Sequence, residues 1–212
     1  MSDIVLHYAD AALLVFDKPA GLLSVPGRGP DKADCLAARA QAQYADALIV
    51  HRLDRDTSGL IVMARGAEIH RVLSRAFAER RVGKRYVAVV AGRLAPPADW
   101  ATIDLPLVCD WPRRPLQKID FESGKPSVTR WRVAADGAGA DTTRVELEPV
   151  TGRSHQLRVH LAALGHPILG DPLYAPAPFR RRSQRLLLHA TRLAFPHPAT
   201  GAPCVFESPP PF

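Results

Sequence analysis

The sequence has few cysteines and no long apolar segment, and these shortages exclude several classes of protein. Its three cysteines, Cys35, Cys109 and Cys204, are scattered and form no Cys-x-x-Cys pair. This argues against a disulfide framework and a zinc site, and it favours a reducing cytoplasm. The apolar run of residues 11–16 is too short for a signal peptide or a membrane span, and no basic segment precedes it. We therefore expect a cytoplasmic protein that does not associate with a membrane.

Several other features are missing as well. The chain has no glycine-rich nucleotide fingerprint and no convincing set of His and Cys ligands, so neither a cofactor nor a metal is expected. No internal repeat, low-complexity segment or long linker divides the 212 residues. We expect one domain over residues 1–212, with room for two lobes.

The charge of the chain is unbalanced. Lys and Arg total 28 against 21 Asp and Glu, which gives a formal net charge of +7. Such an excess favours polyanions, although a generically basic protein has the same composition. The basic residues gather in three segments, namely residues 80–85, 113–118 and 180–185.

The hydrophobic periodicity predicts more strands than helices. Apolar runs at 13–16, 48–50, 60–64, 85–91, 186–188 and 193–195 predict strands, and alternation over 144–149 predicts a half-buried one. Helical spacing predicts a helix over 67–81 and another from a Ser154 cap to Leu164, ended by Gly165. The fold class expected is α+β, with a mostly antiparallel mixed central sheet flanked by helices and loops.

The polar segment between two of these strands is the best candidate for a functional site. Residues 51–59 separate the apolar runs 48–50 and 60–64. Loops held by strands often carry catalytic groups. Asp, Thr, Ser and Gly also form ordinary turns, so the residue types alone favour a site only modestly.

The same segment resembles a family signature. His-Arg-Leu-Asp-x-x-Thr-Ser-Gly-Leu, at residues 51–60, is similar to the signature of the RluA family of pseudouridine synthases. Further segments resemble the motifs of that family in the expected order, at residues 18–22, 84–86, 151–158 followed by 165–171, and 187–190. The resemblance covers nearly the whole chain. It implies a pseudouridine synthase catalytic domain without a separate S4 RNA-binding domain, and an isomerase that needs no cofactor.

Three catalytic residues follow from the resemblance. Asp54 falls on the catalytic aspartate, which either acts on the anomeric carbon or takes a proton from the neighbouring sugar carbon. Arg153 is implied to pair with Asp54 and to keep its carboxylate ionised. Tyr86 is implied to stack on the uracil and to exchange protons. The target base has to leave the RNA stack to reach these groups.

The resemblance also implies residues that contact RNA. Arg52 either fills the space that the flipped base leaves or binds a phosphate. Lys18 contacts phosphate or braces the loop, and Arg158 touches RNA or braces Arg153. His51 is expected to be structural. Four more basic residues are predicted RNA contacts, namely Lys84, Arg113, Arg114 and Lys118.

Two further segments narrow the range of RNA substrates that the resemblance implies. Residues 110–118 and 124–126 resemble a subgroup of the family, which implies uridines in large-subunit rRNA and in a tRNA anticodon stem-loop. The expected partner is therefore a structured RNA, and we expect the protein to act as a monomer.

Two other functions compete with this interpretation. Residues 53–56 resemble the Asp-x-Asp motif of a haloacid-dehalogenase-type phosphatase, but Thr57 comes one position early for that motif. A non-catalytic RNA-binding module would explain the charge, although binding alone does not require the set of Asp54, Tyr86 and Arg153.

Overall fold

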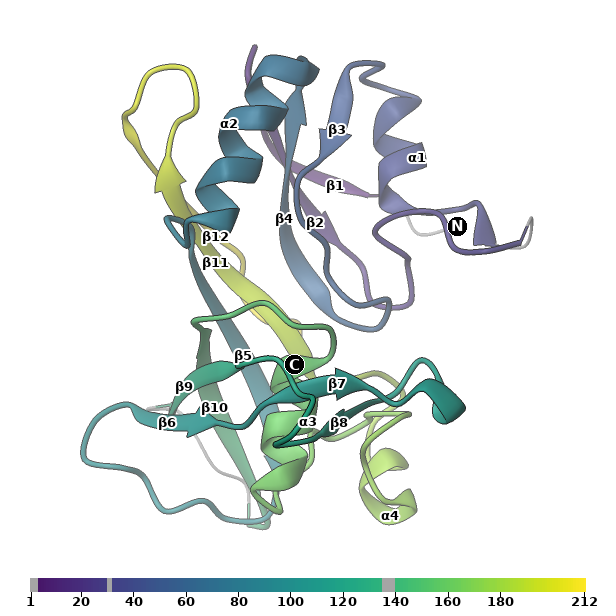
Figure 1. Cartoon of the computed structure of the whole chain (residues 1–212), viewed down its shortest axis with the longest axis vertical. Helices are drawn as coiled ribbons and strands as arrows, with labels where there is room; N and C mark the ends of the chain where they lie inside the picture. The colour runs from purple at the N-terminus through teal and green to yellow at the C-terminus, as the bar shows by residue number, and fades with distance from the viewer. Residues whose placement is uncertain (1–3, 30–31, 135–139) are drawn as a thin grey trace. The chain divides into compact units, whose positions relative to one another are not determined.

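The structure is a computed structural model that describes residues 4–29, 32–134 and 140–212. The chain divides into two compact units. Unit 1 consists of residues 1–84 and 189–211, and unit 2 consists of residues 85–188 together with Phe212. Each unit has a sheet, and Figure 1 labels the helices and strands.

Unit 1 is built on a mixed sheet. Strands β1, β2, β4 and β11 follow one another in that order, while β3 also pairs with β4 and β12 pairs with β11. The pairing of β4 with β11 is parallel, whereas β1–β2, β2–β4, β3–β4 and β11–β12 are antiparallel. The strands span β1 Val5–Ala9, β2 Leu13–Lys18, β3 Ala47–Ile49, β4 Ser58–Arg65, β11 Leu188–Pro196 and β12 Pro203–Glu207.

Helices cover both faces of this sheet. Helix α1 (Leu36–Gln41) packs with Phe16 and Ile61 on one face, and α2 (Gly66–Ala78) packs with Val15 and Val62 on the other (Figure 1). Seven of the eight residues of β4 are buried. A strand covered on both faces needs apolar side chains at every position, which explains the unbroken apolar run at 60–64.

Helix α2 ends earlier than its spacing predicts. The expected helix runs to residue 81, but α2 stops at Ala78 and Arg80 takes a left-handed φ of 58°. The Arg81 N–H bonds the Ala76 carbonyl at 2.9 Å, and the Arg80 N–H bonds the Phe77 carbonyl at 3.1 Å. This pair of bonds is a Schellman motif, which satisfies the last carbonyls of the helix and turns the chain away.

Unit 2 contains an antiparallel sheet covered by one helix. Strands β5 (Gly83–Ala91), β10 (Thr142–Pro149), β9 (Val128–Val133) and β6 (Ala101–Asp104) lie in that order. Val145 and Leu147 of β10 pack with Leu157 and Leu161 of α3 (Gln156–Ala163) in the buried core. Buried and half-buried residues alternate along β10, so the predicted half-buried strand is confirmed.

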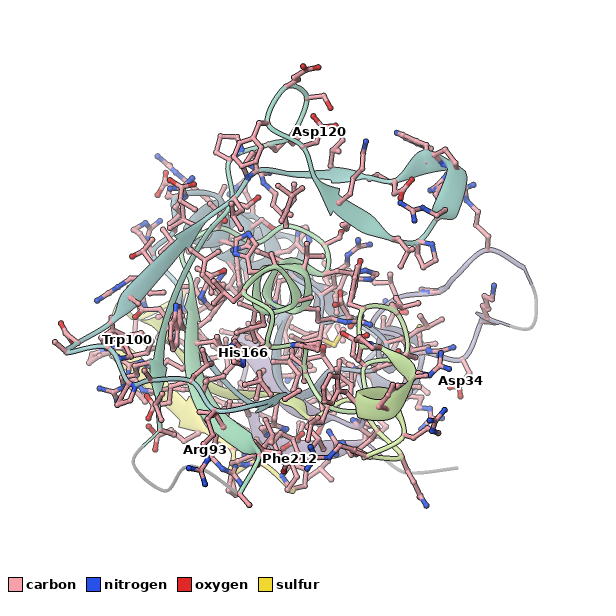
Figure 2. The ribbon with its side chains drawn as sticks, turned by 90° about the horizontal axis from the view of Figure 1, so that it is seen from below. Asp34, Arg93, Trp100, Asp120, His166 and Phe212 are labelled. Carbon is pink, nitrogen blue, oxygen red and sulfur yellow. The ribbon has the colours of Figure 1, made fainter. Side chains whose placement is uncertain are left out.

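Two short strands form a separate hairpin in unit 2. Strands β7 (Leu107–Cys109) and β8 (Gln117–Ile119) pair with each other and enclose a 3-10 helix at Trp111–Arg113. Figure 2 shows Asp120 on the turn that follows β8. A last short helix, α4, covers Ala177–Arg180. Three-residue strands give too little periodicity to be read from a sequence.

The α+β fold with a mostly antiparallel mixed sheet is confirmed, and two local predictions are wrong. Helix α3 has His155 as its N-cap, with a left-handed φ of 55°, in place of the expected Ser154. The strand expected at 186–188 begins only at Leu188, the first residue of β11, while Leu186 packs in the core of unit 2 outside a strand. The strand predicted at 193–195 is part of the longer β11.

Candidate active site

Asp54 lies in unit 1, on the loop between β3 and β4, and is half-buried. The residue before it is fixed by Ser24, whose hydroxyl donates to the Leu53 carbonyl at 2.8 Å and accepts the Leu53 N–H at 3.1 Å. The Thr57 N–H closes a turn on the Asp54 carbonyl at 3.2 Å. The backbone around Asp54 is therefore held on both sides before any RNA binds.

Lys18 holds the residue after Asp54. Its ammonium donates to the carbonyls of Pro19 at 2.9 Å, Leu22 at 2.7 Å and Arg55 at 2.9 Å, and the side chain is fully buried. A buried ammonium with three donors is stable only when carbonyls of this kind surround it. The assignment of Lys18 to RNA binding is therefore wrong, and the three hydrogen bonds favour its alternative role of bracing the loop.

His51 at the start of the loop is structural, as expected. Its Nε2 accepts the Val62 N–H at 3.1 Å, and its ring stacks on Phe77 with centroids 4.5 Å apart. Desolvation of the ring, followed by the nearby charge of Lys84, lowers the pKa of His51 to about 3. A neutral imidazole at neutral pH keeps Nε2 available as an acceptor.

The end of the loop is tied into a chain of hydrogen bonds. Ser58 Oγ lies 2.8 Å from His189 Nδ1, and His189 Nε2 lies 3.1 Å from Ser208 Oγ. The Ser208 hydroxyl in turn donates to Asp17 on β2. Ser58 and His189 lie in two separate segments that resemble family motifs. No local pattern in the sequence indicates that two residues 131 positions apart are partners.

Arg153 lies in unit 2, on an exposed turn before α3. Gln156 shapes this turn, because its carbonyl oxygen accepts from the Arg153 N–H at 3.0 Å and from the Thr151 hydroxyl at 2.8 Å. The Gln156 amide nitrogen donates to the Val128 carbonyl and to Thr129 Oγ1, both at 2.9 Å. The turn that presents Arg153 is thus tied to the start of strand β9.

Tyr86 also lies in unit 2, on β5 opposite Leu147 of β10. It is half-buried and packs against the core of the unit. The set of Asp54, Tyr86 and Arg153 is therefore divided between the units, with Asp54 in unit 1 and the other two in unit 2.

Arg158 is the second basic residue that the structure removes from the RNA contacts. It is 2% exposed, and its Nε and a terminal nitrogen bind the two carboxylate oxygens of Asp171 at 2.8 and 2.6 Å. Its Cζ also lies 5.2 Å from the centre of the Tyr174 ring. The assignment of Arg158 to RNA binding is wrong, because a buried, bidentate guanidinium is not available to a phosphate.

Three predicted RNA contacts lie on the β7–β8 hairpin. Arg113 is 71% exposed and reaches the Asp110 carboxylate at 2.6 Å. The guanidinium of Arg114 lies over the Trp111 ring, with Cζ 4.5 Å from its centre. Lys118 is 49% exposed. These side chains can reach RNA, and their role stays a prediction.

The remaining two predicted contacts belong to unit 1. Arg52 is exposed on the loop of Asp54. Lys84 is half-buried at the start of β5, and burial, followed by the charge of Arg80, lowers its pKa.

Two other kinds of feature are absent from the part of the chain that the structure describes. Among residues 4–29, 32–134 and 140–212, no group of three or more His, Cys, Asp and Glu side chains is placed to hold a metal ion. No helix in those ranges is long and apolar enough to cross a membrane.

Comparison with known proteins identifies the class. The chain belongs to the RNA pseudouridylate synthase family, whose model matches residues 12–163. Among curated relatives, the dual-specificity RNA pseudouridine synthase RluA of Escherichia coli K12 is 50% identical over 206 residues, which is 97% of this chain and 93% of the relative. The protein of the same description from Pasteurella multocida is 49% identical over 208 residues, which is 98% of this chain and 93% of the relative.

Solved structures agree with this assignment. Human RNA pseudouridylate synthase domain containing 1 aligns with a TM-score of 0.80 and 30% identity, over 99% of this chain and 84% of the human chain. Human RNA pseudouridylate synthase domain containing 4 aligns with a TM-score of 0.72 and 25% identity, over 98% and 88%. The protein is therefore an isomerase that acts on RNA, and the phosphatase and the non-catalytic binding module are set aside.

Proposed function

We propose that this enzyme converts uridine to pseudouridine in large-subunit ribosomal RNA and in a tRNA anticodon stem-loop. Support comes from its similarity to bacterial relatives named as dual-specificity RNA pseudouridine synthases. The segments at 110–118 and 124–126 resemble the same subgroup.

Asp54 is proposed as the catalytic carboxylate. The reaction breaks the bond from the sugar C1′ to N1 of uracil, turns the base, and forms a bond from C1′ to C5, with the C5 proton lost and N1 protonated. A carboxylate either attacks C1′ as the bond to N1 breaks or removes a proton from C2′. The observation that carries the assignment is the support of the loop: Leu53 is tied to Ser24 and Arg55 to Lys18, so the backbone that carries the carboxylate is held on both sides.

Arg153 and Tyr86 are proposed to complete the active site. A guanidinium beside a carboxylate favours its ionised form, which both mechanisms require. A tyrosine ring can stack on uracil, and its hydroxyl can exchange protons during re-attachment. These roles rest on the family motifs at 151–158 and 84–86, while the turn around Gln156 supports a fixed position for Arg153.

RNA is proposed to be held by exposed basic side chains. Arg52, two residues before Asp54 on an exposed part of the loop, is proposed to occupy the space of the flipped base or to bind a neighbouring phosphate. The other proposed phosphate contacts are Lys84, Arg113, Arg114 and Lys118. We also propose that the enzyme acts as a monomer in the cytoplasm, where ribosomal and transfer RNA are its substrates. Light scattering of the purified enzyme tests the monomer.

The experiment that tests this function is the Asp54→Asn variant. Pseudouridine is mapped chemically in transcripts of a large-subunit rRNA fragment and of a tRNA anticodon arm after incubation with each protein. Asp54→Asn should lower the rate at least about a thousand-fold, as expected when a catalytic nucleophile or base is lost, while RNA binding is largely kept. The matched control is Asp56→Asn, two residues further along the same loop, which should retain activity within about three-fold.

Two outcomes separate the parts of the proposal. Substantial activity in Asp54→Asn would remove Asp54 from the chemistry. Modification of only one of the two transcripts would remove the dual substrate while leaving the catalytic assignment in place.

A further inference from the structure

The β7–β8 hairpin carries features of a nucleic-acid contact, and Leu107 at its base exchanges two backbone hydrogen bonds with Lys125, at 3.0 and 2.8 Å. Trp111 is 67% exposed, and the Arg114 guanidinium lies over its ring. Aromatic rings with stacked arginines are common partners of RNA bases and phosphates. The hairpin is a separate two-stranded sheet, and two strands alone are only marginally stable. Its direction must therefore be set by contacts at its base.

One hydroxyl makes such a contact and reaches the Arg153 turn as well. The Gln117 N–H at the start of β8 donates to Tyr174 Oη at 2.9 Å. The same Oη lies 2.7 Å from Nδ1 of His155, the N-cap of α3. With Nδ1 unprotonated, the phenol accepts from Gln117 and donates to His155. His155 is two residues after Arg153, so a single side chain connects the hairpin to the turn that presents Arg153.

Tyr174 is itself held rigidly. Its N–H and the N–H of Leu173 donate to one carboxylate oxygen of Asp171, at 3.2 and 2.8 Å. The same carboxylate binds Arg158, whose guanidinium lies over the Tyr174 ring. The buried ion pair of Arg158 and Asp171 therefore fixes the position of the Tyr174 phenol, which lies between the hairpin and α3.

From these contacts we infer that Tyr174 is a positioning residue that fixes the β7–β8 hairpin relative to the Arg153 turn. This inference rests on the proposed function, because it matters only if the hairpin binds RNA and Arg153 belongs to the active site. Binding energy gained on the hairpin can orient the reacting nucleotide only when the hairpin is firmly joined to that turn. The ring of Tyr174→Phe keeps its packing against Arg158, while both hydrogen bonds of the hydroxyl are lost.

The test is a double-mutant cycle on kcat/KM with Tyr174→Phe, Arg114→Ala and the double variant. The probe is the anticodon-arm transcript that the wild-type enzyme modifies. We expect Arg114→Ala to lower kcat/KM about ten-fold in the wild-type background but less than about three-fold in the Tyr174→Phe background, since a hairpin without its bond to Tyr174 orients the RNA less well. The matched control is Tyr44→Phe in unit 1, in which Arg114→Ala should keep its full effect.

A local measurement complements the cycle. Amide hydrogen exchange should be faster across residues 107–119 in Tyr174→Phe, with exchange in β4 and β10 unchanged. If Tyr174→Phe does not fold, His155→Asn replaces it, because asparagine accepts the left-handed conformation of that position and leaves the ion pair of Arg158 and Asp171 intact.

The outcomes distinguish the inference from the proposed function. If Arg114→Ala lowers kcat/KM by the same factor in the wild-type and the Tyr174→Phe backgrounds, the coupling between Tyr174 and the hairpin is refuted. The hairpin then remains an RNA contact. If Arg114→Ala has no effect in the wild-type background, the hairpin contact and the coupling both fall. The role of Asp54 is decided separately by Asp54→Asn.

Discussion

Replacing Lys18 by methionine tests the support of the catalytic loop most directly. Methionine matches the length of the lysine stem, so the change removes the ammonium with little loss of packing. The carbonyl of Arg55 keeps a donor, because the Gly21 N–H also bonds it at 2.9 Å. The carbonyls of Pro19 and Leu22 lose the donor that binds them at 2.9 and 2.7 Å.

The expected cost follows from these contacts. Each buried carbonyl that loses its donor costs about 1–3 kcal/mol, and the relief of no longer burying a charge offsets part of the sum. We expect Lys18→Met to lower the free energy of unfolding by about 3 kcal/mol, which corresponds to a fall in Tm of roughly 6–12 °C for a chain of this size. The rate of isomerisation should fall as well, because the Arg55 carbonyl loses its bond to the end of β2 and keeps only the bond from the Gly21 N–H.

The assay is thermal and urea unfolding followed by circular dichroism, with salt titrations of RNA binding on the same proteins. Exposed Lys125→Met is the control, and its Tm should stay within about 2 °C of wild type. A buried lysine makes no phosphate contact, so the slope of log Kd against log salt should not change in Lys18→Met. An unchanged Tm, or a slope reduced by about one, would refute the bracing role.

Three further predictions follow from the site. The pKa of His51 is about 3 in the folded protein and near 6.5 in the unfolded chain. As the pH is lowered, the unfolded chain therefore binds the proton first, and the free energy of unfolding decreases. We expect His51 to account for a loss of about 2 kcal/mol between pH 6.5 and 5. That dependence should flatten in His51→Gln, and urea unfolding as a function of pH measures it. Arg158→Met leaves the buried Asp171 carboxylate without its guanidinium and should lower the free energy of unfolding by about 3–5 kcal/mol. In urea unfolding, the double variant Arg158→Met with Asp171→Asn should lose less stability than the two single variants added together. Simple additivity would contradict the pairing. Arg52→Ala should weaken RNA binding and reduce the salt slope by about one, whereas an unchanged Kd would argue against a contact at that position.

The sequence was most informative where periodicity is long or a motif is specific. Strand β4 and helix α2 were both expected, because an apolar run of five residues and a helical stripe of several turns are strong signals. The end of α2 was missed, because Arg80 adopts a left-handed conformation that arginine seldom shows. The alternation on β10 was read correctly, whereas the three-residue strands β7 and β8 were too short to be detected.

Burial of charge was the main error at the site. Lys18 and Arg158 were expected, from the family resemblance, to contact RNA or to brace the site, yet both are buried, unlike most basic residues. Lys18 depends on a carbonyl 37 positions away, and Arg158 on a carboxylate 13 positions away. Partners at such separations come together only in the folded chain, so single-sequence patterns do not contain them.

The link between Ser58 and His189 also has a consequence for how the enzyme is made. A ribosome that has just added Ser58 must add 131 more positions before its partner exists, which takes roughly 7–26 seconds at usual elongation rates. Throughout that interval the neighbourhood of Asp54 lacks a part of its scaffold. A nascent chain should therefore stay inactive until β11 has emerged from the exit tunnel.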